Sequence, residues 1–228
     1  MKAMILAAGQ GTRLRPLTEH LPKPLIKVGP CSLIEHHIHK IAKAGFESII
    51  INTAYLGKKI EHALGTGSRY GIDLKYSYEG TEALETGGGI AYARPLLGDD
   101  PILIVSADIY TDIIFDPNFN LHTSVHLIMV NNPAHHPEGD FTASQLGMAN
   151  SEQRYTYSGV AYIDPKLFRH ERRTFALSAT INQAISDRSI SAQIHTGSWF
   201  DVGTISRLHA ANRYALQTNS QLGQKFNP

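Results

Sequence analysis

Short apolar runs that alternate with helical patterns are the feature that most limits what this chain can fold into. The runs are Met4 to Ala8, Ser48 to Asn52, Leu74 to Ser77, Ile102 to Ser106 and His126 to Val130. Each is too short for a helix and rich in the residues typical of buried strands. Strands separated by helices predict an α/β fold with a mainly parallel sheet flanked by helices.

A capping sequence marks the first predicted helix. Ser32 is followed three residues later by Glu35, a pairing that satisfies free N–H groups at a helix start. Apolar side chains recur at helical spacing until Gly45, a typical residue for a helix end. Three histidines of this helix are expected on its polar face, without a function: His36, His37 and His39.

Further elements follow along the chain. A second helix is predicted from Tyr55 to Leu64, and the pattern changes from about residue 141. There, Tyr155 to Ile163 alternate like a strand and Ser178 to Asp187 have helical spacing, so we expect a small β-rich lid over the sheet. Ile205 to Leu216 predict a closing helix with Thr204 as its N-cap.

Composition excludes several classes of protein. With 42% hydrophobic and 18% charged residues in 228, the chain is an ordinary globular protein of one-domain length. A net charge of +1 without a basic run gives no reason to expect nucleic acid or a membrane surface as a partner. No apolar stretch approaches the roughly 18 residues of a spanning helix. The single cysteine, Cys31, fits a reducing compartment, so we expect a cytoplasmic protein.

The segment after the first strand has the composition of an anion-binding loop. Gly9 and Gly11, with neighbouring alanines, let backbone N–H groups approach a phosphate at the carboxyl edge of a sheet. Two cations, Arg13 and Lys23, would offset the repulsion between reacting phosphates. The spacing is not that of a P-loop, and Leu14 replaces the third glycine of a dinucleotide fingerprint. A solvated glycine turn is the alternative.

Two aspartates are candidates to hold a divalent ion. Asp108 follows the strand Ile102 to Ser106, and Asp201 lies just before the closing helix. Mg²⁺ prefers one or two carboxylates together with phosphate oxygens. A turn or capping role is the alternative for each aspartate. Asp112 is a reserve ligand or a substrate contact.

The first loop resembles the L-x-x-G-x-G-T-R-L-x-P-L-T…P-K-P signature of sugar-phosphate nucleotidyltransferases and matches it at every defining position. The resemblance implies a Rossmann-like fold of the nucleotide-diphospho-sugar transferase type. It also implies transfer of a nucleotidyl group from a nucleoside triphosphate to a sugar 1-phosphate, with release of pyrophosphate. By the same resemblance Arg13 contacts the triphosphate and the leaving pyrophosphate, and Lys23 contacts the α-phosphate under attack.

Other segments extend the resemblance. Asp108 and Asp201 match the family's metal-binding aspartates, although Ala107 stands where glycine is usual. The segment Glu82 to Gly89 resembles the family's E-P-L-G-T-A-G, which lies against the base and the sugar. We expect it to be a loop before a helix from Ile90 to Leu97, with backbone groups freed by the glycines binding a base edge.

Two segments resemble the sugar-side motifs, Gly139-Asp140-Phe141 and Tyr157-Ser158-Gly159-Val160. Their glycines allow close approach, and Asp140 can accept hydrogen bonds from sugar hydroxyls. We expect His135 and His136 to line the acceptor pocket. A zinc site is the alternative for them, although no cluster supplies the other ligands that zinc needs.

The predicted site residues form four groups. The catalytic residues are Arg13 and Lys23. The nucleotide-binding residues are Ala7, Ala8, Gly9, Gly11, Thr12, Arg13, Lys23, Glu82, Gly87 and Gly88. The substrate-binding residues are Asp108, Gly139, Asp140, Ser158, Gly159 and Trp199, and Mg²⁺ is held by Asp108 and Asp201. In one domain, residues 1–130 mainly bind the nucleotide, 131–217 mainly bind the sugar and close the fold, and 218–228 form a polar tail.

Within the family, three segments are most similar to the N-acetylmuramate 1-phosphate uridylyltransferases: Leu84 to Gly89, Asn132 to Phe141 and Trp199 to Thr204. Those enzymes make UDP-N-acetylmuramate in peptidoglycan recycling, so UTP and N-acetylmuramate 1-phosphate are the implied substrates. The alternatives are a short mannose 1-phosphate guanylyltransferase or another small sugar- or choline-phosphate nucleotidyltransferase. An inactive nucleotide sensor and an NAD-linked oxidoreductase are alternatives of other classes, although the latter needs an acid where Asn52 stands. The sequence carries no signal for an oligomeric state.

Overall fold

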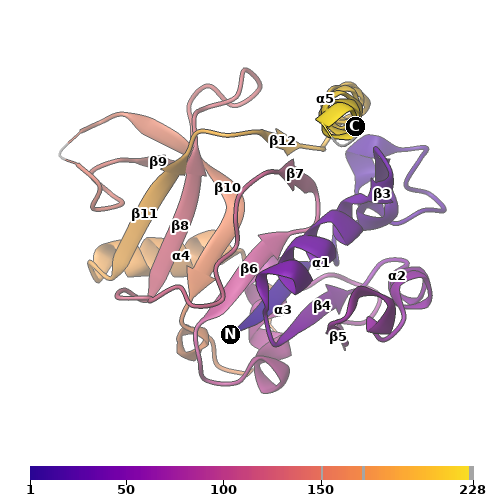
Figure 1. The fold of residues 1–228 in the computed structure, drawn as a ribbon. Coiled ribbons are helices and arrows are strands. Elements are labelled where there is room, and N and C mark those ends of the chain that lie inside the picture. The colour runs from indigo at the N-terminus through magenta and orange to yellow at the C-terminus, as the bar shows by residue number, and fades with distance from the viewer. Residues whose placement is uncertain (150, 171–172, 226–228) are drawn as a thin grey trace.

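The computed structural model describes residues 1–149, 151–170 and 173–225, which form a central sheet with helices on both faces (Figure 1). Within these residues the sheet has eight strands in the order β11-β8-β10-β6-β1-β4-β5, with β9 paired to β10. The strands are β1 (Lys2–Leu6), β4 (Ser48–Thr53), β5 (Asp73–Tyr78), β6 (Ile102–Ser106), β8 (Val125–Val130), β9 (Phe141–Thr142), β10 (Arg154–Ile163) and β11 (Ile190–His195).

The sheet is mainly parallel, as predicted. β1 pairs in parallel with β4 and β6, β4 with β5, and β11 with β8, whereas β10 runs antiparallel to both β6 and β8. The prediction that Tyr155 to Ile163 belong to a lid over the sheet is wrong, because this segment lies inside the sheet. Alternation of side chains indicates a strand but does not indicate which strands it pairs with.

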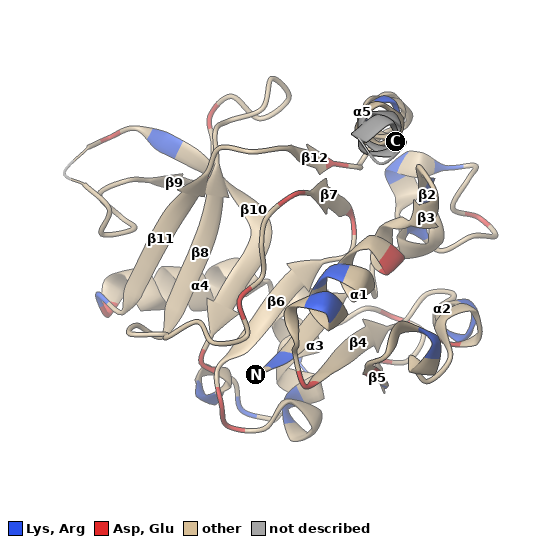
Figure 2. Ribbon diagram, viewed as in Figure 1, with Lys and Arg blue, Asp and Glu red and all other residues tan. Residues whose placement is uncertain are grey.

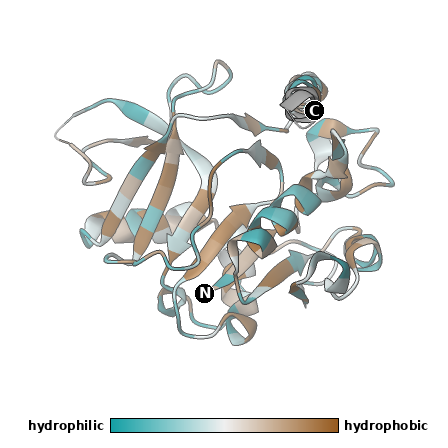
Figure 3. Ribbon diagram, viewed as in Figure 1, coloured by the Kyte–Doolittle hydropathy of each residue, from teal (hydrophilic) through white to brown (hydrophobic). Residues whose placement is uncertain are grey.

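Helices cover the two faces of the sheet. α1 (Leu33–Ala44) and α2 (Gly57–Leu64) pack on one face, and α3 (Glu85–Leu97) and α4 (Leu177–Ser186) on the other. Successive side chains of a strand point to opposite faces, so Ala3 and Ile5 of β1 join the α1 core whereas Met4 joins the α3 core. In Figure 3 the strands of the central sheet are mostly hydrophobic, whereas hydrophilic residues are frequent on α1 and in the loops.

The predicted first helix is confirmed, including its cap. The Glu35 carboxylate accepts hydrogen bonds from the Ser32 backbone N–H (3.0 Å) and the Ser32 hydroxyl (2.7 Å), and Gly45 ends the helix in the left-handed region. The placement of His37 on the polar face is wrong, since only 1% of it is exposed. Its Nε2–H donates to the Ile109 carbonyl oxygen at 2.9 Å, which satisfies one ring nitrogen inside the core, whereas the buried Nδ1 has no hydrogen-bond partner among the described residues.

Two short ribbons and a long helix complete the fold. β7 (Ile109–Thr111) pairs with β12 (Trp199–Asp201), and β2 (Lys27–Val28) pairs with β3 (Cys31–Ser32). α5 (Ile205–Lys225) packs on a third apolar cluster that includes Leu14 and Val202. The short 3-10 helices are η1 (Thr12–Leu14), η2 (Lys23–Leu25), η3 (Ser68–Tyr70) and η4 (Pro165–Leu167).

The end of the chain differs in part from the prediction. The closing helix begins at Ile205 as expected, but α5 continues to Lys225, where a polar tail was predicted from residue 218. Residues 226–228 of that predicted tail lie outside the described residues. No helix in the described ranges is long and apolar enough to cross a membrane. Positively and negatively charged residues are interspersed along the ribbon (Figure 2).

Candidate functional site

A cleft lies at the carboxyl ends of β1 and β6 and has two adjoining compartments. The loop compartment, about 330 Å³, is lined by the loop after β1, and the β10 compartment, about 560 Å³, is lined by the central part of β10. Both have in common the wall residues Leu6, Arg13, Thr86, Ser106 and Asp108. A molecule in one compartment is therefore adjacent to a molecule in the other.

The loop after β1 has a backbone conformation that depends on glycine. Gly11 has φ of 65°, and a Cβ there would lie 3.0 Å from Cβ of Lys23 and 3.1 Å from Cγ2 of Thr18. The Thr18 hydroxyl donates to the Gly11 carbonyl oxygen at 2.9 Å, and buried Leu14 anchors the end of the loop. The predicted nucleotide-binding residues of this segment all line the loop compartment: Ala7, Ala8, Gly9, Gly11, Thr12, Arg13 and Lys23.

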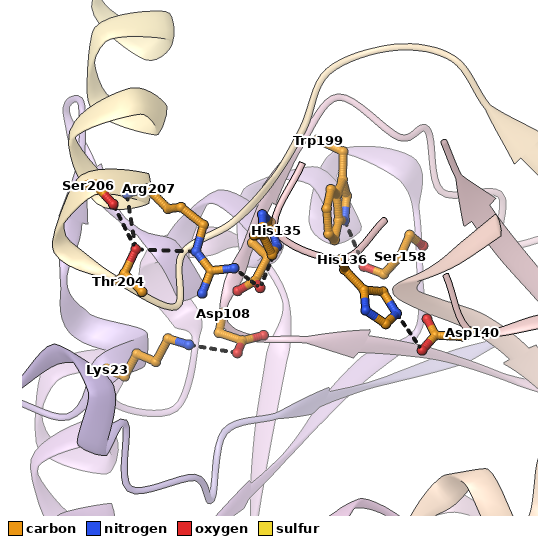
Figure 4. Close-up of polar contacts among 11 residues, drawn as sticks. Lys23, Asp108, His135, His136, Asp140, Ser158, Trp199, Thr204, Ser206 and Arg207 are labelled. Atoms are coloured by element: carbon orange, nitrogen blue, oxygen red, sulfur yellow. Dashed lines mark hydrogen bonds and ion pairs between the residues drawn. The ribbon is translucent and has the colours of Figure 1, made fainter. Parts of the chain in front are cut away.

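The two predicted catalytic cations differ in their surroundings. Lys23 is 8% exposed, and its Nζ lies 2.7 Å from Oδ2 of Asp108 (Figure 4). A buried ammonium needs such a partner, because burial removes its water. Arg13 is exposed at the wall common to both compartments and makes no hydrogen bond or ion pair within the described part of the chain. Arg13 is thus a cation available to an incoming anion.

The two predicted metal-binding aspartates lie at the same end of the β7–β12 ribbon, Asp108 just before β7 and Asp201 as the last residue of β12. Asp201 pairs with Ile109 across the ribbon, and the Val202 N–H donates to the Asp108 carbonyl oxygen at 2.9 Å. Oδ2 of Asp201 accepts a hydrogen bond from Nη1 of Arg207 at 2.8 Å and lies 3.5 Å from Nε2 of His135. Figure 4 shows His135 and Arg207 on the same side of the cleft as the Lys23–Asp108 pair.

The donor set at this ribbon fits one kind of metal. In the described residues, no three His, Cys, Asp or Glu side chains are close enough to hold an ion by themselves. Two neighbouring carboxylates, Asp108 and Asp201, suit Mg²⁺, which takes its other ligands from phosphate oxygens and water. The residues present therefore fit a Mg²⁺ ion that binds together with a phosphate substrate.

The glycines that were predicted to form a base-binding loop lie inside a helix. α3 begins at Glu85, five residues before the predicted start, so the prediction of a loop is wrong here. The Gly88 N–H donates to the Phe175 carbonyl oxygen at 3.0 Å, and a Cβ at Gly87 would lie 2.5 Å from the Phe175 ring. These glycines let a second segment of backbone pack closely against the helix.

The predicted nucleotide-binding residues of this segment are displaced from the cleft. Glu82, Gly87 and Gly88 do not line the loop compartment. Their neighbours Ala83, Glu85 and Thr86 line it instead, because the helix starts early and buries its glycines.

The sugar-side motifs meet in the β10 compartment. Asp140 accepts a hydrogen bond from the Tyr157 N–H at 2.7 Å and lies 3.1 Å from Nε2 of His136. The Trp199 indole N–H donates to the Ser158 carbonyl oxygen at 2.8 Å, at a register shift of β10. Such irregularities redirect side chains and occur next to binding sites.

The glycines of these motifs have different roles. Gly159 lines the β10 compartment at φ of 84°, where a Cβ would meet Ser106. Gly139 does not line either compartment; its φ is 58°, and a Cβ would lie 2.5 Å from Oδ1 of Asn132. The positive φ and the close packing against Asn132 explain why glycine stands at position 139, and the geometry of the cleft gives no support to its predicted substrate contact.

Asp112, the reserve ligand, lies outside both compartments. Its Oδ1 is 2.7 Å from Nε2 of His195. Partial burial acts to raise the pKa of Asp112, but hydrogen bonds from Ser198 and His195 outweigh it and hold the pKa below the usual range. Asp112 thus joins the end of β11 to β7.

Arg207 is a charged residue of the site that the sequence analysis missed. Arg207 lines the β10 compartment and binds Asp201 from the first turn of α5. A cation is disfavoured at a helix N-terminus, because the helix dipole is positive there. The position of Arg207, three residues after the predicted N-cap Thr204, was a signal that a nearby anion holds it.

Comparisons with known proteins agree with this geometry. The sequence profile of the family described as Nucleotidyl transferase matches residues 2–139. An N-acetylmuramate alpha-1-phosphate uridylyltransferase of Neisseria meningitidis serogroup B is 45% identical over 227 residues, which cover 94% of this chain and 98% of that protein. A mannose-1-phosphate guanylyltransferase catalytic subunit beta of Danio rerio is 37% identical over 125 residues, which cover 54% of this chain and 34% of that protein.

A solved structure has the same fold. It is a Bacillus anthracis protein described as a glucose-1-phosphate thymidylyltransferase, with a TM-score of 0.78 and 20% identity, covering 94% of this chain and 95% of the other.

Proposed function

The chain belongs to the nucleotidyl transferase family, and from that premise we propose that it transfers a uridylyl group from UTP to N-acetylmuramate 1-phosphate. The products are UDP-N-acetylmuramate and pyrophosphate. The observation that carries this proposal is the common wall of the two compartments, with Arg13 and Asp108 on it. The nucleotide is assigned to the loop compartment and the sugar phosphate to the β10 compartment, so the reacting groups meet at that wall.

The reaction requires positioning and positive charge. An oxygen of the sugar phosphate attacks the α-phosphorus of UTP, a new P–O bond forms, and the bond to the β-phosphate oxygen breaks as pyrophosphate leaves. Because both substrates are anions, cations must offset their repulsion. We assign Lys23 to the α-phosphate, because it is fixed by Asp108 at the common wall, and Arg13 to the triphosphate and the leaving group.

We further assign a Mg²⁺ ion to Asp108 and Asp201. When bound, the ion supplies positive charge to the phosphate oxygens. The protein holds the two carboxylates in place from both sides, through Lys23 on Asp108 and Arg207 on Asp201.

The choice of substrates rests on the relative that matches over most of both chains. At 45% identity over 94% of this chain, the Neisseria uridylyltransferase includes the segments of both compartments, whereas the mannose-1-phosphate guanylyltransferase match covers 54%. We therefore favour the uridylyltransferase over the guanylyltransferase. A role in peptidoglycan recycling follows from that choice, and the cytoplasmic location stays a prediction.

The test is pyrophosphate release across a matrix of substrates. Five nucleoside triphosphates are combined with the 1-phosphates of N-acetylmuramate, N-acetylglucosamine, glucose and mannose, and kcat/KM is compared. UTP with N-acetylmuramate 1-phosphate is expected to give the highest value. A higher kcat/KM for GTP with mannose 1-phosphate would replace the proposed substrates with that pair.

A further inference from the structure

Glu85 has a backbone conformation that its residue type disfavours. It is the first residue of α3 and has φ of 60°, one of three non-glycine residues with positive φ in the described ranges, beside Leu56 and Arg188. Such a conformation brings the Cβ close to its own backbone, and glycine adopts it without that cost. The family's segment E-P-L-G-T-A-G, which Glu82 to Gly88 resembles, has glycine as its fourth residue, where this chain has Glu85.

The surrounding structure fixes this conformation from both sides. The Leu84 N–H donates to Oε2 of buried Glu79 at 2.7 Å, and the Leu84 carbonyl oxygen accepts from the Phe175 N–H at 3.2 Å. After Glu85, the Thr86 hydroxyl accepts from the Leu177 N–H at 2.9 Å. Strained residues persist where neighbouring contacts determine the backbone in this way, and they gather at functional sites.

The side chain of Glu85 faces the cleft. It is exposed, it lines the loop compartment, and its carboxylate makes no hydrogen bond or ion pair within the described residues. No contact of the Glu85 side chain inside the described protein therefore offsets the strain. The carboxylate is instead placed to contact a molecule in the loop compartment, which is the compartment assigned to the nucleotide.

The charge and the hydrogen-bonding capacity of a carboxylate determine which part of a nucleotide it can contact. When ionised it only accepts hydrogen bonds, so it repels a triphosphate and attracts neutral O–H or N–H donors. Ribose offers two adjacent hydroxyl donors, and carboxylates recognise ribose hydroxyls in other nucleotide-binding folds. On the basis of the proposed function, we propose that Glu85 is a specificity-determining residue whose carboxylate accepts a hydrogen bond from the ribose 2′-hydroxyl of the nucleotide.

The test compares UTP with 2′-deoxy-UTP in three proteins. The wild type is expected to prefer UTP by roughly 10- to 100-fold in kcat/KM, because a site built to bind a hydroxyl discriminates against the analogue that lacks it. In Glu85→Gly the preference should fall to within about 3-fold, with the loss in the KM for UTP. Glu85→Gln keeps the strain and a neutral acceptor, so its preference should lie between the two.

The glycine variant separates a binding role from a structural one. Glycine suits φ of 60°, so Glu85→Gly should keep or raise the Tm while it loses discrimination. The control is Arg188→Gly, which makes the same change at φ of 51°, at an exposed residue outside both compartments, and should leave the preference unchanged.

Two outcomes would overturn the assignment. One is an unchanged ratio of UTP to 2′-deoxy-UTP in Glu85→Gly. The other is a change in preference among bases without a change between the two sugars, which would assign the carboxylate to the base. If the substrate matrix ranks another nucleoside triphosphate first, the ribo and 2′-deoxy forms of that nucleotide are compared instead. A wrong assignment of UTP can then be distinguished from a wrong assignment of Glu85.

Discussion

The loop compartment and the β10 compartment differ in how their polar side chains are engaged. In the loop compartment, Arg13 and Glu85 have no partner among the described residues, and much of the wall is the backbone of small residues. In the β10 compartment, the Asp140 carboxylate accepts a hydrogen bond from the Tyr157 N–H, and the Trp199 indole N–H donates one to the Ser158 carbonyl oxygen.

With the substrates assigned as proposed above, the difference corresponds to two ways of recognising a substrate. A triphosphate carries much charge and is bound by backbone N–H groups and cations that any nucleotide of the class can use. A sugar is neutral apart from its phosphate, so its recognition depends on side chains held at fixed positions by one another. Substitutions at the common wall should therefore mainly lower kcat. Substitutions deeper in one compartment should mainly raise the KM for the substrate that is assigned to it.

The largest effect is expected at Asp108, which borders both compartments. Asp108→Asn removes a proposed Mg²⁺ ligand and the ionised partner of Lys23, so kcat should fall roughly 1,000-fold while the protein folds normally. The measurement is steady-state turnover over a Mg²⁺ titration, with circular dichroism as the check on folding. Near wild-type turnover at saturating Mg²⁺ would show that the metal assignment is wrong.

The next largest effects should distinguish the role of Lys23 in catalysis from that of Arg13 in nucleotide binding. Lys23→Ala should mainly lower kcat, because its charge matters most as the α-phosphate is attacked, and Arg13→Ala should also raise the KM for UTP. Each lost contact should cost about 2–4 kcal/mol, or roughly 30- to 1,000-fold in kcat/KM.

The KM for the sugar phosphate serves as the internal comparison in both variants. If Lys23→Ala changed the KM for UTP and left kcat intact, its role at the reacting phosphorus would have to be withdrawn.

A smaller effect concerns stability and the support of the common wall. His37 donates a hydrogen bond to Ile109 of β7, the strand that follows Asp108. Burial, and to a smaller extent repulsion from Lys40, lowers the pKa of His37 from 6.5 to about 3. The unfolded chain therefore binds a proton that the folded protein excludes. The His37 contribution to stability is complete above about pH 6.5 and is lost as the pH falls toward about 3.

The measurement is the free energy of unfolding by urea at several pH values. The slope due to His37 should approach about 1.4 kcal/mol per pH unit, and His37→Asn should show a shallower dependence. Parallel curves for the two proteins would contradict the burial of a neutral imidazole.

The smallest effect is expected in the β10 compartment. Trp199→Phe keeps most of the ring but loses the hydrogen bond to the Ser158 carbonyl oxygen, at a cost of about 1 kcal/mol. The KM for the sugar 1-phosphate should rise roughly 5-fold with the KM for UTP unchanged. Equal changes in both KM values would indicate that the two compartments do not act separately.

The loop compartment was the more predictable of the two. Gly9 to Lys23 lie close together in sequence, and small residues and cations at this spacing suit an anion, so the loop was predicted to line a site before its geometry was known. The segment from Glu82 to Gly88 was predicted less well. Its glycines were interpreted as open backbone, but Phe175, a residue far along the chain, packs against them.

The β10 compartment depends on pairings that no local pattern contains. His37 contacts Ile109 only because α1 and β7 meet in the folded protein, and Arg207 contacts Asp201 because α5 begins shortly after β12 and its first turn faces that strand. Lys23 and Asp108, predicted as separate groups, form one ion pair. Each of these contacts joins residues on different elements of the fold.

The sequence by itself determined most helices, six strands of the central sheet and its mainly parallel pairing, because these follow from local spacing, capping and side-chain periodicity. The tertiary structure alone decided that β10 lies within the sheet, that the α3 glycines are buried, and that Glu85 faces the cleft with a strained backbone. The physical reason is that side-chain periodicity records which face of an element is buried, whereas the partner on that face is set by long-range packing.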